Sequence, residues 1–299
     1  MFYFNLLCLN TMHHLPIETD TYFNSYARIP DKFRKFLIPA ARYHYKTDGV
    51  NSTLDMNIAL EGFSIWIHYF WLKTLVNLKP FNSKDVYVLH YWLSRHPENT
   101  LIFLKAEEHE PWPARGHSLS MHVNVDPAKL SKLGLEQLTQ TADSSSSISA
   151  VSIRILKKIL RCRYIGPLAE CYLGKYCAIL YSIYLNNPTK ISIDPETRWK
   201  LYRILQYAGS HPQKIHSYEI LAQQFNIDFD IMKAGFEQEF HISLFEFILQ
   251  ERMDLAFKLL MHHNLDTVAN KLGYPTTFLC SADFELFFGC TPLQLQMAQ

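Results

Sequence analysis

The feature that most constrains this fold is a pattern of apolar residues and turn signals that occurs twice within residues 217–292. In the first copy, Asn226 supplies a turn residue that tolerates a left-handed backbone, and Asp228 is placed to cap the helix that follows. In the second copy, Gly273 ends the first helix. The apolar positions recur at helical spacing, so each copy predicts two short helices joined by a turn, a helix-turn-helix unit. The stripes are Leu221, Ala222 and Phe225, then Met232, Phe236 and Phe240, in the first copy, and Leu265, Val268, Ala269 and Leu272, then Cys280, Phe284 and Phe288, in the second.

A longer helix is predicted between the two copies. Ser243 and Glu246 form a capping box at its start, and its apolar stripe is broken by Arg252 before it ends near His263. At roughly 1.5 Å per residue the helix is on the order of 27 Å long, close to the ~34 Å between successive major grooves on one face of DNA. A helix of this length would hold the second helices of the two units, here called the reading helices, about one turn of DNA apart.

Residues 217–292 resemble the DNA-binding domain of AraC/XylS-type transcription regulators. The segments that carry the resemblance are "LAQQFNIDFDIMKAGFEQEF", "FILQERMDLAFKLL", "VANKLGY" and "DFELFFGCTP", which fall in the family's order and spacing. The resemblance implies a DNA-binding transcription regulator whose partner is promoter DNA. It also implies helical connectors and an N-terminal sensing half that is often a cupin-like barrel.

The resemblance also implies which residues of the two reading helices face DNA. Lys233 is suited to a guanine or a phosphate, whereas Asp230 and Glu237 would repel the backbone unless one accepts from a cytosine amine. Phe278 would touch a thymine methyl group. The full set of predicted DNA-binding residues is Asp230, Lys233, Ala234 and Glu237 on the first helix and Thr277, Phe278, Ser281 and Ala282 on the second.

The charge of this region favours a different interpretation. Residues 211–299 contain five Lys and Arg against eleven Asp and Glu, a net charge of −6, so the rest of the chain carries +7 to reach the total of +1. Acidic Glu237 and Glu285 stand where the family usually has a basic residue, and phosphate binding depends on Lys and Arg. The alternative is a non-enzymatic ligand-sensing or protein-interaction protein that keeps the helix-turn-helix fold with weak or no DNA binding. A basic rim from Lys214, Lys258, Lys271 and the 154–163 helix would favour DNA binding.

The N-terminal half is predicted to be rich in β-strands, so the whole chain is expected to be α+β. Short aromatic and β-branched runs separated by turn residues indicate a small sandwich or barrel. We predict a β-rich sensing or association domain at 1–143, a Ser-rich linker at 144–149, a helical connector at 150–210 and the double helix-turn-helix domain at 211–299. The strand candidates are 63–70, 86–93, 101–105 and 119–125.

The connector is predicted to contain three helices. The first has a basic surface within residues 154–163, the second spans 165–185, and Asp194 caps the third, which Gly209 ends. The apolar stripe of the second helix would either pack internally or pair two protomers as a homodimer. Trp66, Trp71 and Trp92 leave two interpretations open, a packed core or the wall of a pocket for a small-molecule effector.

No metal, cofactor or catalytic site is predicted. His68, His90, His117 and His122 lie near the predicted strands, but the sequence has no His-x-His pair of the kind a cupin metal site needs. The chain also lacks a G-x-S-x-G, a phosphate-binding glycine loop and an H-E-x-x-H, so no enzyme is expected.

The six cysteines form no C-x-x-C pair, which favours reduced thiols and a cytoplasmic protein. A redox role for Cys162, Cys171 and Cys177 is a minor alternative. No apolar run of about 18 residues occurs, so no membrane span is predicted.

Overall fold

The structure is a computed structural model that describes residues 17–19, 24–26, 28–80, 86–93, 98–104, 112–132, 145–186, 188, 190–214 and 217–298. The chain forms two compact units. The β unit consists of residues 1–148 and 157–164, and the helical unit consists of residues 149–156 and 165–299. The chain is therefore α+β, as predicted.

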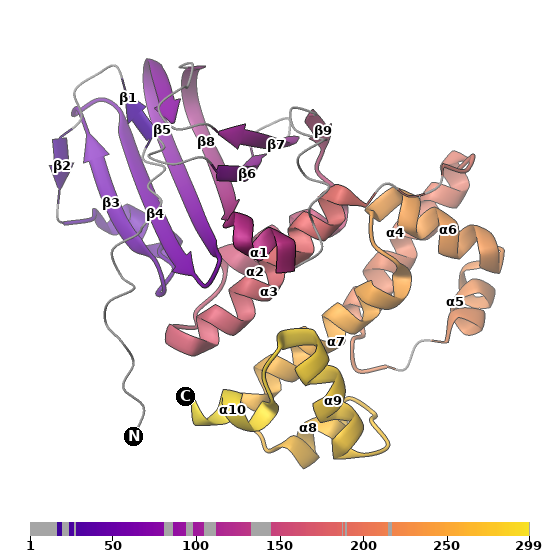
Figure 1. Cartoon of the computed structure of the whole chain (residues 1–299). Coiled ribbons are helices and arrows are strands. Elements are labelled where there is room, and N and C mark those ends of the chain that lie inside the picture. Colours follow the sequence, from indigo (N-terminus) through magenta and orange to yellow (C-terminus); the bar gives the residue numbers. More distant parts are fainter. Residues whose placement is uncertain are drawn as a thin grey trace. The chain divides into compact units, whose positions relative to one another are not determined.

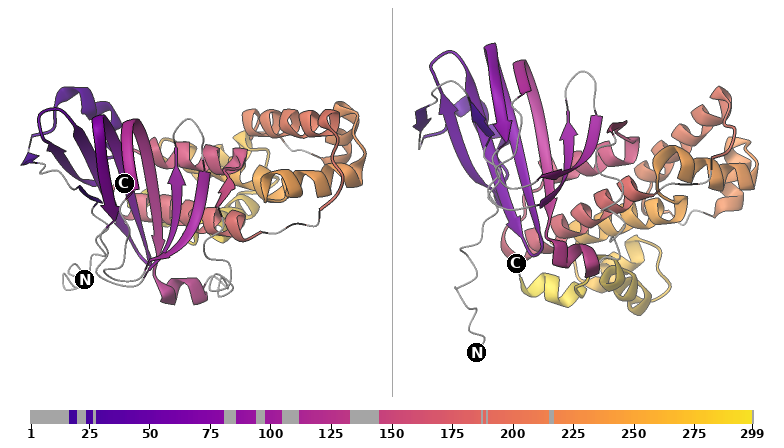
Figure 2. Two further views of the ribbon diagram at one scale, coloured as in Figure 1. Left: turned by 90° about the horizontal axis from the view of Figure 1, so that it is seen from above. Right: turned by 45° about the horizontal axis from the view of Figure 1, so that its top comes forward.

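The β unit contains an antiparallel sheet whose described strands run in the order β2-β3-β4-β5-β8-β6-β7-β9, with β1 also paired to β5 (Figures 1 and 2). The elements are β1 (Ile17–Thr19), β2 (Asn24–Tyr26), a 3-10 helix (Asp31–Phe36), β3 (Arg42–Thr47), β4 (Ser52–Leu60), β5 (Phe63–Pro80), β6 (Val86–Trp92), β7 (Glu98–Leu104), β8 (Trp112–Val125), α1 (Pro127–Lys132) and β9 (Ser145–Ser147).

The four predicted strands are present as parts of β5, β6, β7 and β8. Strands β3 and β4 were not predicted, although the residues of β4 alternate between apolar and polar as expected for a strand. Leu54 and Met56 lie on one buried face and Asp55 on the other. The segment predicted as a Ser-rich linker contains β9, which pairs with β7.

The helical unit contains α3 to α10 and the first part of α2, and none of the described helices is long and apolar enough to cross a bilayer. Helices α3 and α4 belong to the same compact unit as the C-terminal helices. The elements are α2 (Ala150–Leu160), α3 (Gly166–Leu185), α4 (Pro195–Ser210), α5 (Tyr218–Phe225), α6 (Phe229–Phe240), α7 (Leu244–Leu260), α8 (Leu265–Lys271), α9 (Thr277–Phe288) and α10 (Pro292–Met297).

Helices α5 and α6 form a first helix pair, and α8 and α9 form a second. The turn of each pair contains a left-handed residue, Asn226 with φ 47° in the first and Gly273 with φ 71° in the second. In each turn the following amide reaches back five residues to a carbonyl, a bond that closes a helix C-terminus around a left-handed residue. These bonds run from Ile227 N to Ala222 O (3.0 Å) and from Tyr274 N to Ala269 O (2.9 Å).

The second helices of the two pairs, α6 and α9, also resemble each other. Each has 12 residues and ends at a left-handed residue, His241 after α6 and Gly289 after α9. A capping box then starts the next helix in both cases, which explains why α10, absent from the sequence-based prediction, follows the second pair as α7 follows the first. The boxes are Ser243 with Glu246 and Thr291 with Gln294.

Helix α7 lies between the two pairs and joins their cores (Figure 1). Near its start, Phe247 packs against Phe236 of α6, with ring centroids 5.8 Å apart. Near its end, Phe257 packs against Phe288 of α9 at 5.0 Å. Burying a side chain of this size stabilises the fold by about 1.5–3 kcal/mol, so α7 holds the pairs together through apolar contacts at both ends.

Arg252 interrupts the apolar stripe of α7 because its guanidinium group bonds to backbone carbonyls. It donates to Leu272 O at the end of α8 (2.8 Å) and to Lys214 O ahead of α5 (3.1 Å). The guanidinium also lies 4.8 Å from the ring centroid of Tyr274. Arg252 therefore provides hydrogen-bond donors to backbone carbonyls beside the first pair and within the second.

Candidate nucleic-acid interface

The first turns of α6 and α9 are set by their N-caps. The Asp228 carboxylate accepts from the amides of Asp230 (2.9 Å) and Ile231 (3.0 Å), and the Thr276 hydroxyl accepts from Leu279 N (3.3 Å). Each cap satisfies amides that would otherwise lack a partner and fixes the residue at which the helix begins. It thereby decides which side chains point outward.

The four residues predicted on α6 lie together. Asp230 and Lys233 are exposed, Ala234 and Glu237 are half-buried, and all four line one open pocket of about 360 Å³. The Lys233 ammonium lies 5.3 Å from the ring centroid of Phe229. This face can offer one cation and two carboxylates to a partner.

The residues predicted on α9 form a face without charge at its N-terminal end. Phe278 is 77% exposed, Ala282 is exposed, and Thr277 and Ser281 are half-buried. Hydroxyl groups can exchange hydrogen bonds with base edges, and an exposed aromatic ring can touch a methyl group or another apolar surface.

Matching α9 to α6 from their N-caps reveals residues that the predicted set omitted. Phe278 matches Asp230, Ser281 matches Lys233, and Glu285 matches Glu237. Glu285 is exposed, and the next residue, Leu286, is 80% exposed. In the sequence each glutamate directly follows a core phenylalanine, Phe236 or Phe284, and this shared spacing could have identified Glu285 as part of the outward face.

Most of the basic residues in residues 217–298 are engaged within the protein. Lys258 donates to the buried Asp254 carboxylate at 2.6 Å, and Lys271 Nζ lies 3.0 Å from His263 Nε2. Together with Arg252 and Lys233, these are the four Lys and Arg of that stretch. Lys233 is the one on the predicted DNA-facing set.

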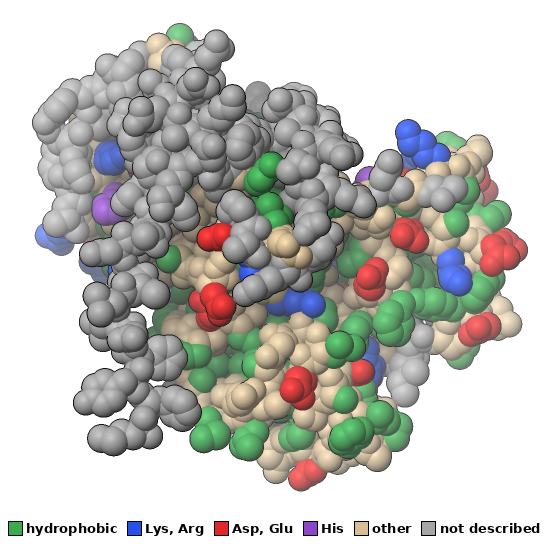
Figure 3. Space-filling model, in the orientation of Figure 1, with side chains coloured by type: hydrophobic (Ala, Val, Ile, Leu, Met, Phe, Trp, Pro, Cys, Tyr) green, Lys and Arg blue, Asp and Glu red, His purple; other side chains and the backbone are tan. Residues whose placement is uncertain are grey.

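The basic residues of the 154–163 helix are divided between the two compact units. Arg154 bonds to Glu251 of α7 at 3.3 Å, and residues 157–164 belong to the β unit. Over the described surface of the helical unit in Figure 3, apolar and acidic side chains are more prominent than basic ones. Because Lys233 is the one basic residue of the predicted DNA-facing set, electrostatic attraction of phosphates by that set is weak.

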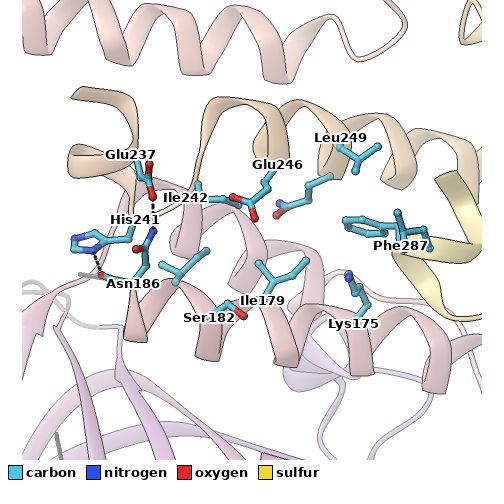
Figure 4. A pocket seen from close by; sticks show the side chains of 13 residues that line it. Lys175, Ile179, Ser182, Asn186, Glu237, His241, Ile242, Glu246, Leu249 and Phe287 are labelled. Carbon is cyan, nitrogen blue, oxygen red and sulfur yellow. Dashed lines mark hydrogen bonds between the residues drawn. The ribbon is translucent and has the colours of Figure 1, made fainter. Parts of the chain in front are cut away.

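A second pocket, of about 510 Å³, lies between α3 on one side and α6, α7 and α9 on the other (Figure 4). Asn186 Nδ2 donates to Glu237 at 3.3 Å, and Asn186 O is 2.9 Å from His241 Nδ1. Burial lowers the pKa of Lys175, whose ammonium lies 4.4 Å from the ring centroid of Phe287. The pocket residues thus connect α3 to the C-terminal ends of α6 and α9.

The histidines of the β unit form a buried polar row. Across neighbouring strands, His68 pairs directly with Asp55 and with Ser120, and His68 Nδ1 is 2.8 Å from Asp55 Oδ1. The Ser120 hydroxyl lies between His90 Nε2 (2.9 Å) and His122 Nε2 (3.0 Å).

Burial governs the protonation of these groups. Burial lowers the pKa of His90 to about 4 and lowers that of His122 well below its usual value. Burial by itself raises the pKa of Asp55, but the hydrogen bond with His68 and the nearby charges outweigh it and hold the pKa below its usual value. His117 is exposed, and no group of three or more potential metal ligands occurs among the described residues.

Comparison with known proteins finds similarity only to solved structures, and at low TM-scores. No protein-family model and no curated protein matches it. Similar solved structures include the C-terminal domain of AraT, a response regulator from Geobacillus stearothermophilus, at 23% identity over 36% of this chain and 89% of that one, with a TM-score of 0.33. The DNA-binding domain of AdpA, a global transcriptional factor in complex with a target DNA, is 19% identical over 33% of this chain and 91% of that one, with a TM-score of 0.32.

ToxT from Vibrio cholerae matches over a longer stretch, at 10% identity, 79% of this chain and 98% of that one, with a TM-score of 0.30. These neighbours are regulators of the AraC/XylS type, the family that the sequence resembles.

Proposed function

We propose that this chain is a non-enzymatic, DNA-binding transcription regulator of AraC type, in which α5–α6 and α8–α9 are two helix-turn-helix units. The observation that supports this is the duplicated architecture. Both pairs use the same turn bond, both have a second helix of 12 residues that ends at a left-handed residue, and both attach to the ends of one α-helix, α7. With 17 residues, α7 is about 25 Å long, so it can hold two reading helices at neighbouring major grooves.

In this proposal the two reading helices contact DNA in different ways. Lys233 on α6 binds a phosphate or a guanine, and Asp230 or Glu237 accepts from a cytosine amine. On α9, Phe278 contacts a thymine methyl, while the hydroxyls of Thr277 and Ser281 bond to base edges; Ala234 and Ala282 allow close approach. With a single basic residue in the set, affinity depends mainly on uncharged contacts.

The proposal extends to the rest of the chain. Residues 1–143 form a cupin-like unit that senses a small-molecule effector or mediates homodimer formation, residues 150–210 connect it to the DNA-binding part, and the protein acts in the cytoplasm. The aromatic and polar side chains on the buried face of β5 and β8 support a sensing role, because pockets for small molecules combine apolar walls with a few polar groups.

Fluorescence anisotropy of the full chain with a duplex from its own upstream region tests DNA binding directly. The expected affinity exceeds that for a scrambled duplex by about a thousandfold and falls as salt rises. Lys233→Glu weakens binding by reversing a charge at the interface. Lys190→Glu, the same change at an exposed residue between α3 and α4, leaves the affinity unchanged.

A second candidate, a protein-binding function without DNA recognition, is favoured by the exposed apolar residues Phe278, Leu286 and Leu293 beside an acidic surface. Exposed apolar groups of this kind mark protein interfaces when they cluster. No binding to either duplex at low salt, by protein whose circular dichroism spectrum is that of a folded chain, would favour this candidate and reject the first.

A further inference from the structure

Two cysteines from distant parts of the sequence meet in the helical unit. Cys171 is on α3, and Cys290 is in the short turn between α9 and α10. Their Sγ atoms lie 2.8 Å apart although 119 residues separate them, and the Cys171 thiol is also 3.6 Å from Phe288 O. The sequence grouped Cys171 with Cys162 and Cys177, but both of those are buried elsewhere.

Aromatic packing holds the two thiols in this position. Tyr172, the neighbour of Cys171, packs on Phe257 of α7 at 5.1 Å and on Phe288 of α9 at 6.4 Å. Its hydroxyl donates to the buried Asp254 at 2.6 Å, which fixes the ring and with it the adjacent turn of α3. On the other side, the left-handed residue Gly289 directs the chain from α9 to Cys290.

The environment of the pair suits oxidation better than that of the other described cysteines. Cys171 and Cys290 are half-buried, so a small oxidant can reach them, whereas Cys162, Cys177 and Cys280 are buried. The hydrogen bond that Cys290 accepts from Cys171 lowers the pKa of Cys290 and raises that of Cys171. Burial raises the pKa of Cys162 and of Cys280 to about 11, which keeps them as unreactive thiols.

We propose that Cys171 and Cys290 are a reversible redox-modification site, at which a hydroperoxide such as hydrogen peroxide converts the two thiols into an intramolecular disulfide. The sulfur atoms approach by less than about 1 Å to reach the ~2.05 Å of an S–S bond. The cross-link joins α3 covalently to the end of α9. This site is independent of whether α6 and α9 read DNA.

The reaction proceeds in two balanced steps. The Cys290 thiolate attacks one peroxide oxygen; an S–O bond forms, the O–O bond breaks, and the departing hydroxide takes up the thiol proton as water. The sulfur of Cys171 then attacks the Cys290 sulfenic acid; the S–S bond forms, the S–O bond breaks, and a second water leaves with the Cys171 proton. Two thiols and one hydrogen peroxide yield one disulfide and two waters, and an added dithiol reverses the change.

The test treats the reduced full-length chain with hydrogen peroxide, blocks the remaining thiols with N-ethylmaleimide and digests it without reductant. Mass spectrometry is expected to find a Cys171–Cys290 cross-linked peptide, about 2 Da lighter than the two reduced peptides together, and a loss of two of the six thiols. Dithiothreitol restores both thiols. A cross-link to any other cysteine, retention of all six thiols, or a disulfide between two chains would overturn the proposal.

Single substitutions separate the role of Cys290, which reacts with the peroxide, from that of Cys171, which then closes the disulfide. In Cys171→Ser, Cys290 stops at sulfenic acid and is labelled by dimedone, whereas in Cys290→Ser position 171 resists both peroxide and dimedone. Cys177→Ser, on the same helix as Cys171, keeps the cross-link. Oxidation of the wild-type chain in concentrated urea should lose the preference for this pair; the same preference in urea would contradict a site built by the fold.

Discussion

In the first helix pair the backbone turns through Asn226 and α6 begins at the Asp228 cap. In the second pair the backbone turns through Gly273, and the segment between this turn residue and the Thr276 cap is one residue longer than in the first pair. Three buried residues of α6, Met232, Phe236 and Phe240, then match Cys280, Phe284 and Phe288 of α9. On the outside, Asp230 and Lys233 are replaced by Phe278 and Ser281. A shared scaffold therefore carries two different surfaces, since the core tolerates few substitutions while exposed positions tolerate many.

The largest expected effect tests whether the two cores are equivalent. Phe236→Ala and Phe284→Ala each remove a fully buried ring and should each lower the free energy of unfolding by about 3–5 kcal/mol. Urea unfolding of the full chain followed by far-UV circular dichroism measures this loss. Phe278→Ala, on the same helix as Phe284 but 77% exposed, should change stability by less than about 0.5 kcal/mol. A large loss from only one core variant would break the equivalence.

The next effect concerns Arg252, which bonds to both pairs. Arg252→Met keeps the apolar stem but removes charged donors from Leu272 O and Lys214 O, and is expected to cost about 2 kcal/mol. The control is Arg198→Met, which breaks a surface ion pair with Glu239 and should cost less than about 1 kcal/mol by the same urea assay. Equal, small losses would mean that the pairs do not depend on this shared side chain.

A smaller effect compares the two turns. Gly273→Ala adds a β-carbon to a left-handed residue, and Asn226→Ala removes the short amide side chain that favours this conformation, so each should cost about 1–2 kcal/mol in chemical unfolding. Asn226→Gly makes the first turn like the second and should cost less than Asn226→Ala. If Asn226→Ala were neutral, the left-handed conformation would not limit the first turn.

The smallest effect tests the outward faces, and it rests on the proposed DNA binding. Lys233→Gln should lower the slope of log affinity against log salt by about 0.9, because one phosphate contact is lost. Ser281→Ala, at the matching position of α9, should leave the slope unchanged and reduce affinity about equally at every salt concentration. Anisotropy titrations at several salt concentrations give both slopes, and a change in the slope with Ser281→Ala would argue against an uncharged role for α9.

Local chemistry explains why much of the helical unit could be predicted. The caps at Asp194 and Asp228, the capping box at Ser243 and the turn at Asn226 involve partners within a few residues, so sequence spacing suffices to find them. Strand β4 was missed although its apolar–polar alternation is visible in the sequence; what the sequence does not record is that the polar face of the strand is buried as well.

The candidate site was predictable in part for the same reason. The four residues chosen on α6 share one pocket, since residues three and four apart lie on one face of a helix. Glu285 was left out of the α9 set because the choice began at Thr277, although the sequence places Glu285 after a core Phe as it places Glu237.

By itself, the sequence determined the class of the fold, the caps at Asp228 and Ser243 and the duplicated turns, because these depend on hydrogen bonds and apolar periodicity over short distances. Only the tertiary structure decided that Arg252 serves backbone carbonyls and that Cys171 meets Cys290. Both contacts join separate segments of the chain. Such contacts arise from packing, which brings together residues that no sequence spacing relates.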